Sequence, residues 1–381
     1  MIEYKIVKIT DLGTVNRGKS KHRPRNDSLL YGGEYPFIQT ADIKKANLYL
    51  SDYSQTYNEI GLKQSKLWKK GTLCFTIAAN IADSAILDID ACFPDSIVGF
   101  LPHENVSDTV YVKYLFDELK LYFQQISKGT TQDNLSLDKI CRVKLRVPNY
   151  ETQKKIALVL SAYDNLIENN NKRIKLLEQM AESLYKEWFV RFRFPGYEDT
   201  EFDNVIPKGW DVKKVKNCVK RLPFNQLYKQ SDLENEGTVI VIDQSSSDFL
   251  GFHNNEPSHY ASVEKPIILF GDHSCKFVLM IRDFSLGENV IPFIAACENE
   301  LDNYYLYYAA HKLISTEEYK RHWGRLTAMK IFVPPYQLQK SFSDIVTLLI
   351  EEKQKLWNEN QLLKKQRDML LPRLMSGKLE A

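Results

Sequence analysis

Two stretches of the sequence carry the residue types of known catalytic motifs, and each lacks a feature that the chemistry requires. Val147-Pro148-Asn149-Tyr150 and Val333-Pro334-Pro335-Tyr336 resemble the Asn/Asp-Pro-Pro-Tyr motif of amino-methyltransferases, but valine cannot supply the amide or carboxylate that grips the target amino group. Pro94-Asp95 and Glu118-Leu119-Lys120 resemble a nuclease metal site, whose Glu and Lys side chains converge from a strand. Here they fall in a predicted helix, where side chains two positions apart do not face each other. The sequence therefore predicts no catalytic residue.

The spacings that bind metals or cofactors are also missing from the sequence. The seven histidines show no metal-ligand spacing. No Gly-x-x-x-x-Gly-Lys-Ser/Thr loop for nucleotide phosphates occurs. Phe270-Gly271-Asp272-His273 lacks the second glycine of a methyl-donor loop. We expect this chain to bind no metal and no cofactor.

A polar, basic stretch from Asn16 to Arg25 is the strongest candidate for a binding function. It holds five Lys or Arg in ten residues, together with glycine and proline, which favour a loop over a helix. One interpretation is a solvated charged loop. The other is contact with nucleic-acid phosphates, which the local density of charge favours. The net charge of +2, from 51 basic and 49 acidic residues, decides nothing here.

The composition bounds the class of protein. A chain of 381 residues with 44% hydrophobic residues is expected to form two or more domains with sizeable cores. The six cysteines lie far apart without a Cys-x-x-Cys pair, which is typical of a reducing compartment. The first residues form no apolar signal region, and no run approaches membrane-spanning length. We expect a soluble, cytoplasmic protein that contacts no membrane.

An internal repeat organises the chain. The pattern Val-Pro-x-Tyr-x-x-Gln begins at Val147 and again at Val333, 186 residues later, and each copy opens a long helical pattern. Apolar residues then recur at alternating steps of three and four, the 3.5-residue period of a coiled coil. The seam of the first copy is Ile156, Leu160, Tyr163, Ile167, Asn170, Ile174, Leu177, Ala181, Leu184 and Trp188. The seam of the second copy is Phe342, Val346, Leu349, Lys353, Leu356, Asn360, Leu363, Arg367 and Leu370.

Each seam contains one asparagine, and the two asparagines predict the orientation of the helices. In an end-to-end antiparallel pair the partners' numbers add to about 530, so Asn170 faces Asn360. A parallel pair would set Asn170 against Leu356 and bury an unpaired amide, at a cost of about 1–3 kcal/mol. Polar seam residues of this kind select register and orientation. We predict an antiparallel two-helix coiled coil; the alternative is two unrelated core helices.

Each long helix follows a mixed α/β (α+β) domain. In the first domain, strand-like runs are predicted at residues 4–9, 35–39, 71–77, 96–100 and 142–147. One amphipathic helix is predicted at residues 111–126. In the second, a strand at 238–242 and a helix at 303–313 repeat this order. We predict two similar domains separated by the coiled coil, as a pseudo-two-fold internal repeat. The boundaries are residues 1–148 (first domain), 149–195 (first helix), 196–335 (linker and second domain) and 336–381 (second helix).

The sequence also marks where the long helices begin and end. Asn149 is a plausible N-cap of the first, which must stop by Phe194-Pro195-Gly196. Pro372 is expected to end or kink the second, so that residues beyond Leu371 do not pair with residues 156–159.

This organisation resembles the specificity subunit of type I restriction–modification systems. The motifs that carry the resemblance are Leu184-Tyr185-Lys186-Glu187-Trp188-Phe189-Val190-Arg191-Phe192-Arg193-Phe194-Pro195-Gly196-Tyr197, Ile206-Pro207-Lys208-Gly209-Trp210, Gly129-Thr130-Thr131-Gln132-Asp133-Asn134-Leu135-Ser136 and Leu374-Met375-Ser376-Gly377-Lys378-Leu379. The second domain departs from the pattern, because its version of the Gly-Thr-Thr-Gln-Asp-Asn loop is the shorter His322-Trp323-Gly324-Arg325-Leu326-Thr327.

The resemblance implies a DNA-binding subunit without catalytic activity of its own. In that family each domain reads one half of a bipartite sequence in double-stranded DNA, and the helices set the gap between the halves. Two methyltransferase subunits dock on the helices and methylate adenine with S-adenosylmethionine, and motor–nuclease subunits add cleavage that needs ATP and Mg²⁺. The alternative function is a helical adaptor that holds two protein partners and touches no DNA.

The resemblance also guides the choice of DNA-contacting residues. We expect phosphate contacts from the basic side chains of the first domain, Arg17, Lys19, Lys21, Arg23 and Arg25. We expect base-edge contacts from amides and hydroxyls of that domain, Gln39, Thr40, Asn80, Thr131, Gln132 and Asn134. The candidates in the second domain are Lys229, Gln244, Ser245, His273, Arg282 and Arg325. For each of them the alternative is an exposed polar side chain without a partner molecule.

Overall fold

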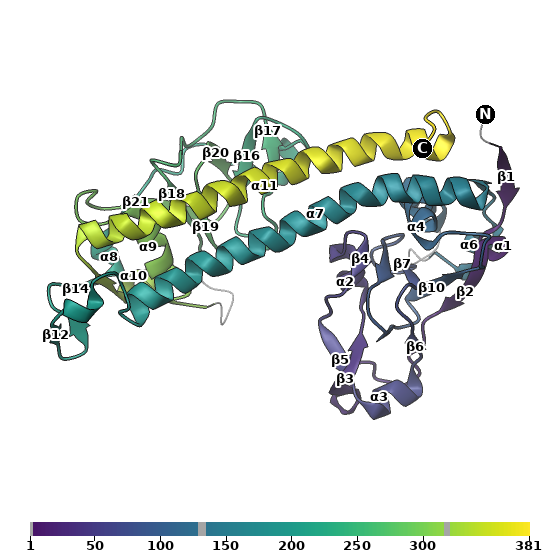
Figure 1. The fold of residues 1–381 in the computed structure, drawn as a ribbon, viewed down its shortest axis with the longest axis horizontal. Helices are drawn as coiled ribbons and strands as arrows, with labels where there is room; N and C mark the ends of the chain where they lie inside the picture. The colour runs from purple at the N-terminus through teal and green to yellow at the C-terminus, as the bar shows by residue number, and fades with distance from the viewer. Residues whose placement is uncertain (1–2, 129–134, 316–320) are drawn as a thin grey trace. The chain divides into compact units, whose positions relative to one another are not determined.

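The protein, seen in a computed structural model, is described over residues 3–128, 135–315 and 321–381. Its contacts divide it into a first unit, Met1–Lys172 with Trp357–Ala381, and a second unit, Arg173–Leu356. Two long helices, α7 (Tyr150–Tyr185) and α11 (Tyr336–Ser376), contribute residues to both units (Figure 1). The predicted mixed α/β class with two long helices is confirmed.

Strands of the first unit form a five-stranded sheet in the order β2–β10–β7–β8–β4, a four-stranded sheet in the order β5–β3–β9–β6, and the antiparallel pair β1–β11. The strands are β1 (Tyr4–Val7), β2 (Gly13–Arg17), β3 (Tyr31–Phe37), β4 (Tyr49–Leu50), β5 (Gln55–Tyr57), β6 (Leu67–Trp68), β7 (Leu73–Thr76), β8 (Ser84–Leu87), β9 (Ala91–Cys92), β10 (Ile97–Pro102) and β11 (Leu145–Pro148). The helices are α1 (Ile9–Leu12), α2 (Thr40–Lys45), α3 (Glu59–Gln64), α4 (Thr109–Glu118), α5 (Lys120–Ser127) and α6 (Leu137–Arg142).

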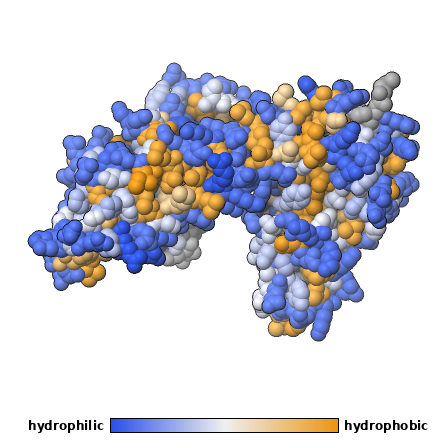
Figure 2. Space-filling view, in the orientation of Figure 1, coloured by the Kyte–Doolittle hydropathy of each residue, from blue (hydrophilic) through white to orange (hydrophobic). Residues whose placement is uncertain are grey.

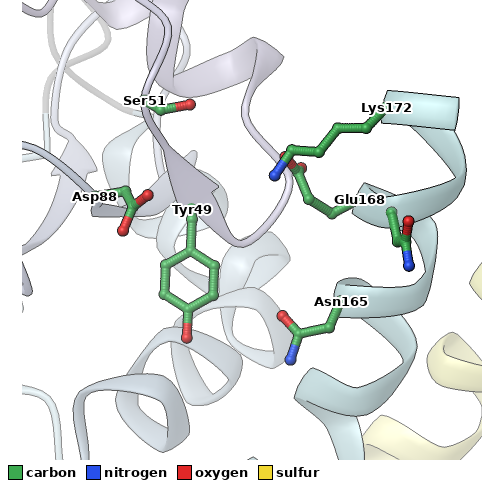
Figure 3. A pocket seen from close by; sticks show the side chains of 7 residues that line it. Tyr49, Ser51, Asp88, Asn165, Glu168 and Lys172 are labelled. Carbon is green, nitrogen blue, oxygen red and sulfur yellow. The ribbon is translucent and has the colours of Figure 1, made fainter. Parts of the chain in front are cut away.

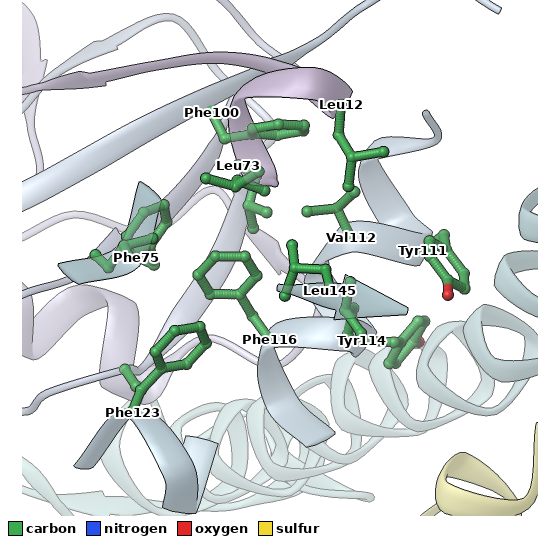
Figure 4. Packing of buried hydrophobic residues seen from close by; sticks show 14 of the residues in the cluster. Leu12, Leu73, Phe75, Phe100, Tyr111, Val112, Tyr114, Phe116, Phe123 and Leu145 are labelled. Carbon is green, nitrogen blue, oxygen red and sulfur yellow. The ribbon is translucent and has the colours of Figure 1, made fainter. Parts of the chain in front are cut away.

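The predicted helix at residues 111–126 is broken in two. Leu119, with φ −87° and ψ 3°, separates α4 from α5. In one straight helix, residues seven apart lie about 10 Å apart along the axis. The break instead stacks Phe123 on Phe116 with ring centroids at 5.0 Å, and both rings are buried in the core of the first unit (Figure 4). Tertiary packing therefore overrides the local helical pattern.

Helix α7 begins where the sequence predicts. The Thr152 N–H donates to Asn149 Oδ1 at 2.9 Å, so Asn149 caps the helix. After Tyr185 a π-helical turn, Lys186–Val190, ends it before Pro195.

Helix α11 does not end at Pro372, so an end of the helix at this residue, one of the two expected outcomes, was wrong. The helix continues to Ser376, and Leu374 and Met375 are only 1% and 7% exposed. Both belong to the apolar core that also contains Ile156 and Leu160, the region we expected to stay unpaired. Pro372 removes one backbone N–H donor, and burial of the two following side chains offsets that loss.

The two helices run antiparallel in each unit. In the first, Asn170 Nδ2 donates to Asn360 Oδ1 at 3.1 Å. In the second, Lys353 pairs with Glu178 at 2.6 Å, and the rings of Trp188 and Phe342 are 6.1 Å apart. Every seam position named above is buried or half-buried in the structure. The Asn170–Asn360 contact that the numbering predicts is therefore present.

A buried ion pair lies about two helical turns from this contact. The Asp164 carboxylate is 1% exposed and accepts hydrogen bonds from Tyr114, Arg367 and Asn47, the last at 2.8 Å. Burial alone would lower the pKa of Arg367, and the Asp164 carboxylate raises it instead. Burial, and then the same carboxylate, raises the pKa of Tyr114. The pair ties α11, α7 and α4 together within the first unit.

Strands of the second unit form a four-stranded sheet in the order β15–β21–β18–β19, a three-stranded sheet in the order β17–β16–β20, and the antiparallel pair β14–β22. The strands are β14 (Asp211–Lys214), β15 (Val219–Arg221), β16 (Val239–Ile242), β17 (Gly251–His253), β18 (Ile267–Gly271), β19 (Phe277–Met280), β20 (Phe284–Leu286), β21 (Val290–Ala295) and β22 (Lys330–Val333). The helices are α8 (Val215–Cys218), α9 (Asn303–Ala310) and α10 (Trp323–Ala328). The predicted linker holds the hairpin β12 (Phe202–Asp203) and β13 (Ile206–Pro207).

The order of elements in the second unit repeats that of the first. In each, an opening strand pairs with the strand that precedes the long helix, β1 with β11 and β14 with β22. The sheets also correspond, since β2–β10–β7–β8 follows the same pairing order as β15–β21–β18–β19. The internal repeat detected in the helices therefore extends through both domains.

We predict that the Asn170–Asn360 pair behaves as a coupled unit. Asn170→Leu leaves the buried Asn360 carbonyl without its donor, so the free energy of unfolding should fall by about 1–3 kcal/mol. The double variant N170L/N360L should recover most of that loss, because neither amide is then left unpaired. Urea unfolding of both variants measures this coupling. Equal stability of the wild type and Asn170→Leu would contradict it.

We also predict that acid destabilises the second unit. Burial lowers the pKa of His253, His259 and His311 from 6.5, so the native state keeps them neutral. The unfolded chain takes up protons below about pH 6.5, so these histidines cost no stability above that pH and lower it as the pH falls. The melting temperature should therefore drop between about pH 7.5 and 5.5. The drop should shrink in H253Q/H259Q; an unchanged drop would assign it to other groups.

Candidate nucleic-acid interface

The basic loop after β2 is held in place by its backbone. The Lys19 N–H donates to the Phe93 carbonyl at 3.0 Å, and the Lys21 N–H donates to Gln64 Oε1 at 2.6 Å. At Gly18, a Cβ atom would lie 2.3 Å from the Pro94 carbonyl oxygen, so only glycine allows this approach. Because backbone contacts fix the loop, its long basic side chains stay on the surface.

The five predicted phosphate contacts fall into two groups. Arg25 pairs with Asp95 at 2.6 Å, and Arg23 lies 3.9 Å from the same carboxylate. Arg23 Nη1 also donates to the Ser20 carbonyl at 2.7 Å. Arg17, Lys19 and Lys21 are exposed, and among the described residues no ion pair is formed by them. The positive charges of this second group are therefore not neutralised by a carboxylate of the described residues.

A strained turn carries the base-edge candidate Asn80. The turn joins β7 to β8, and Ala79 and Ala82 have φ values of 62° and 65°. Residues other than glycine rarely adopt this left-handed backbone conformation. Asn80 is half-exposed between them. Strain of this kind is often kept where a loop has a binding function.

The turn that holds Asn80 contacts the second predicted loop of this domain. The Leu135 N–H donates to the Ile77 carbonyl at 3.0 Å, so the end of the loop before α6 lies against the start of the turn after β7. Thr131, Gln132 and Asn134, predicted on that loop, lie outside the described residues.

Gln39 and Thr40 open helix α2. The Gln39 N–H donates to Asp42 Oδ2 at 2.8 Å, and Gln39 Nε2 donates to Gln55 Oε1 at 2.6 Å. Both Gln39 and Thr40 are half-exposed. Gln39 is therefore oriented by its neighbours and keeps part of its amide at the surface.

The second unit brings several of its candidates together. Asp272, directly after β18, accepts the His322 N–H on its carbonyl at 2.8 Å, which sets the start of α10 against this turn. Gln244 Oε1 accepts the His273 N–H at 3.0 Å, and Arg325 Nη1 lies 3.1 Å from His322 Nδ1. Gln244 and His273 therefore lie with α10, which carries Arg325, around the turn after β18.

The other three candidates of the second unit have different surroundings. The Ser245 hydroxyl donates to Asp243 Oδ1 at 2.6 Å beside Gln244. Lys229 is exposed at the start of a short turn, where its N–H donates to Asp232 at 3.1 Å. Arg282 is half-buried, and burial lowers its pKa.

A cleft of about 410 Å³ in the first unit is lined by polar side chains whose charges are paired. Its lining is Tyr49, Ser51, Asp88, Asn165, Glu168, Asn169 and Lys172 (Figure 3). Lys172 pairs with Glu168 at 3.2 Å, and Asp88 pairs with Lys70 at 2.7 Å, so the charged side chains of the lining already have partners within the protein. Within residues 3–128, 135–315 and 321–381, no three His, Cys, Asp or Glu side chains are grouped to hold a metal ion.

Sequence reasoning did not find the residues that hold the basic loop. Gln64 accepts from the Lys21 and His22 N–H groups at 2.6 and 3.0 Å, and no local pattern marks it. Asp95 was set aside as a chance match to a nuclease motif, yet it orients Arg23 and Arg25. In the described part of the chain, no helix is long and apolar enough to cross a membrane.

Comparison with known proteins identifies the class of this fold. Residues 1–179 match the family model of the type I restriction modification DNA specificity domain. The structure is similar to the crystal structure of a type I restriction–modification system S subunit from M. genitalium, with a TM-score of 0.59 and 16% identity over 98% of this chain and 96% of that one. That likeness concerns the fold.

Sequence relatives extend the match to the whole chain. The chain is 27% identical to the type I restriction enzyme MjaIX specificity subunit of Methanocaldococcus jannaschii, over 99% of this chain and 94% of the relative. It is 28% identical to the type I restriction enzyme HindI specificity subunit of Haemophilus influenzae, over 48% of this chain and 40% of the relative. Over its whole length the chain is thus similar to type I restriction–modification specificity subunits, and the family model covers residues 1–179.

We predict that the exposed lysines of the basic loop contact phosphates. Lys19→Gln and Lys21→Gln should each weaken DNA binding by the assembled complex for all sequences alike. Each should also reduce the slope of log K against log salt by about 0.9, the contribution of one phosphate contact. Arg23→Gln should act in the same direction. Fluorescence anisotropy at several salt concentrations measures the slope.

The matched control is Lys154→Gln, which removes an exposed lysine of α7 that pairs with Glu151 at 2.9 Å. It should leave the slope unchanged. A change in the preferred bases, rather than in the slope, would show that the loop residues read sequence and do not contact phosphates.

Proposed function

We propose that this chain is the DNA sequence-specificity subunit of a type I restriction–modification complex, and that each domain reads one half of a bipartite site. One observation carries the proposal. In the first unit, the turn after β7 contacts the residue that precedes the N-cap of α6, because the Leu135 N–H donates to the Ile77 carbonyl at 3.0 Å. In the second unit, the turn after the corresponding strand, β18, contacts the start of α10, because the His322 N–H donates to the Asp272 carbonyl at 2.8 Å. The same frame thus presents the same two loops in each unit.

The residues on these loops differ between the units, as two different half-sites require. The first unit presents Asn80, whose amide suits the donor and acceptor pattern of a base edge. The second presents Gln244 and His273, with α10 and its Arg325, around the turn after β18. Phosphate contacts from the basic loop would position the first domain without adding sequence information.

The long helices supply the second part of the proposed function, which is to dock methyltransferase subunits and set the gap. Large apolar side chains stand exposed on their outer faces, Leu158, Leu166, Leu362 and Met369 in the first unit and Leu176, Met180, Ile345 and Leu348 in the second. Figure 2 shows patches of apolar surface among the hydrophilic surface of the molecule. Exposed apolar surface of this extent supports a protein partner.

The chemistry of the complex would lie in its partners. S-adenosylmethionine would bind the methyltransferase subunits, and ATP and Mg²⁺ would bind motor–nuclease subunits. This chain would act in the cytoplasm on double-stranded DNA. The exposed apolar helix faces also suit a protein adaptor that touches no DNA, and the experiment below separates the two.

We predict that lengthening both helices lengthens the DNA gap. One heptad would be inserted after Ile174 in α7 and one before Leu356 in α11, which keeps the antiparallel seam in register. Seven residues add about 10 Å of helix, or about 3 base pairs of DNA. Methylome sequencing of a host that expresses the complete system should show the same two half-sites with a gap about 3 base pairs longer.

The control carries the heptad in α7 alone, which breaks the seam and should abolish methylation. A host in which the wild-type system modifies no bipartite sequence would support the adaptor. Altered half-site bases in the double insertion would contradict the assignment of base reading to the domains.

A further inference from the structure

A buried glutamine joins the first domain to the start of α7. Gln153 is 1% exposed and lies in the first turn of the helix. Its Nε2 donates to the carbonyls of Pro148 and Val106, at 3.0 and 3.2 Å, and its Oε1 accepts the Asp108 N–H at 3.1 Å. Three segments that are separate in the sequence meet at this amide: the end of β11, the loop before α4, and α7.

The second domain repeats this contact. Gln339 is fully buried in the first turn of α11. Its Nε2 donates to the carbonyls of Pro334 and Glu300, at 2.7 and 3.0 Å, and its Oε1 accepts the Asp302 N–H at 2.9 Å. We call each set of three bonds a glutamine bridge. The glutamine of the repeated Val-Pro-x-Tyr-x-x-Gln pattern is the residue that forms it.

Each bridge ends on the residue that caps a domain helix. Asp108 Oδ1 accepts the Tyr111 N–H of α4 at 2.9 Å, and Asp302 Oδ1 accepts the Tyr304 and Tyr305 N–H groups of α9 at 2.8 and 3.1 Å. The bridge therefore links the first turn of a domain helix to the first turn of a long helix. Hydrogen bonds, which are directional, therefore join the two helices at their N-terminal ends.

No other side chain provides this set of bonds. The site needs two N–H donors and one acceptor at the end of a stem of two methylene groups, which glutamine supplies. Glutamate would lose both donors and bury a charge, and methionine of similar length would leave all three backbone groups without a partner. The apolar packing around the helix start is non-directional, whereas hydrogen bonds are directional, so the bridge fixes an angle that packing leaves soft.

We propose that Gln153 and Gln339 are positioning residues that fix the angle of each domain on its long helix and so set how sharply the complex discriminates the gap between half-sites. This inference rests on the proposed function. Loss of a bridge relaxes the angle, so sites with one base pair more or less become substrates. The bases of the half-sites stay the same, because the loops that read them lie elsewhere in each domain.

The test uses Gln153→Met and Gln339→Met separately, each expressed in the complete system. The DNA substrates carry the two wild-type half-sites with the natural gap, or with one base pair added or removed. Methylation is measured at each gap by long-read sequencing. We expect the preference for the natural gap to fall on the order of tenfold, the factor equivalent to about 1.4 kcal/mol, with unchanged half-site bases.

Leu73→Ala is the matched control, because Leu73 is a buried core residue of β7 that forms none of the three bonds of the bridge. It should lower overall methylation through lost stability and keep the gap preference. If one glutamine variant does not assemble, the other gives the same readout in the other domain. A wild-type gap preference in the glutamine variants would overturn the inference alone. Absence of any bipartite site in the wild type would overturn the proposed function as well.

Discussion

The register of α7 against α11 depends on buried polar contacts in the first unit. The Asn170–Asn360 amide pair and the Asp164–Arg367 ion pair both join α7 to α11, about two turns apart. A slip by one heptad would separate both pairs and leave buried polar groups without their partners, each at a cost of about 1–3 kcal/mol, or more for the charges. Apolar contacts alone would tolerate such a slip, because leucine seams repeat. These few side chains therefore define one register among several apolar alternatives.

The two units show how one frame can serve two recognition tasks. Residues with the same structural role recur, such as Asp108 and Asp302 at the caps of α4 and α9. The surface turns differ in length and residue type, from the strained Ala79–Ala82 region to the Asp272 turn that receives α10. Buried contacts that join elements are repeated, while exposed side chains vary.

Features with a local physical cause could be predicted from the sequence. The 3.5-residue period and the Asn149 cap are of this kind, because periodicity and capping depend on neighbouring residues. The break at Leu119 and the continuation through Pro372 depend on burial of Phe123, Leu374 and Met375, which no local pattern reveals. At the candidate site, the charge of the basic loop was predictable. Its division between side chains held by Asp95 and side chains facing solvent was not.

The place of Leu374 and Met375 in the first unit has a consequence for the order of synthesis. The second unit is continuous, so all of it has left the ribosome once Leu356 has emerged. The core of the first unit includes these two residues and contacts made by α11, which are translated last. The first unit is therefore completed only after the second unit has been translated. Until then the apolar seam of α7 has no partner helix. Nascent chains of this protein expose that seam from the emergence of α7 until α11 has been translated.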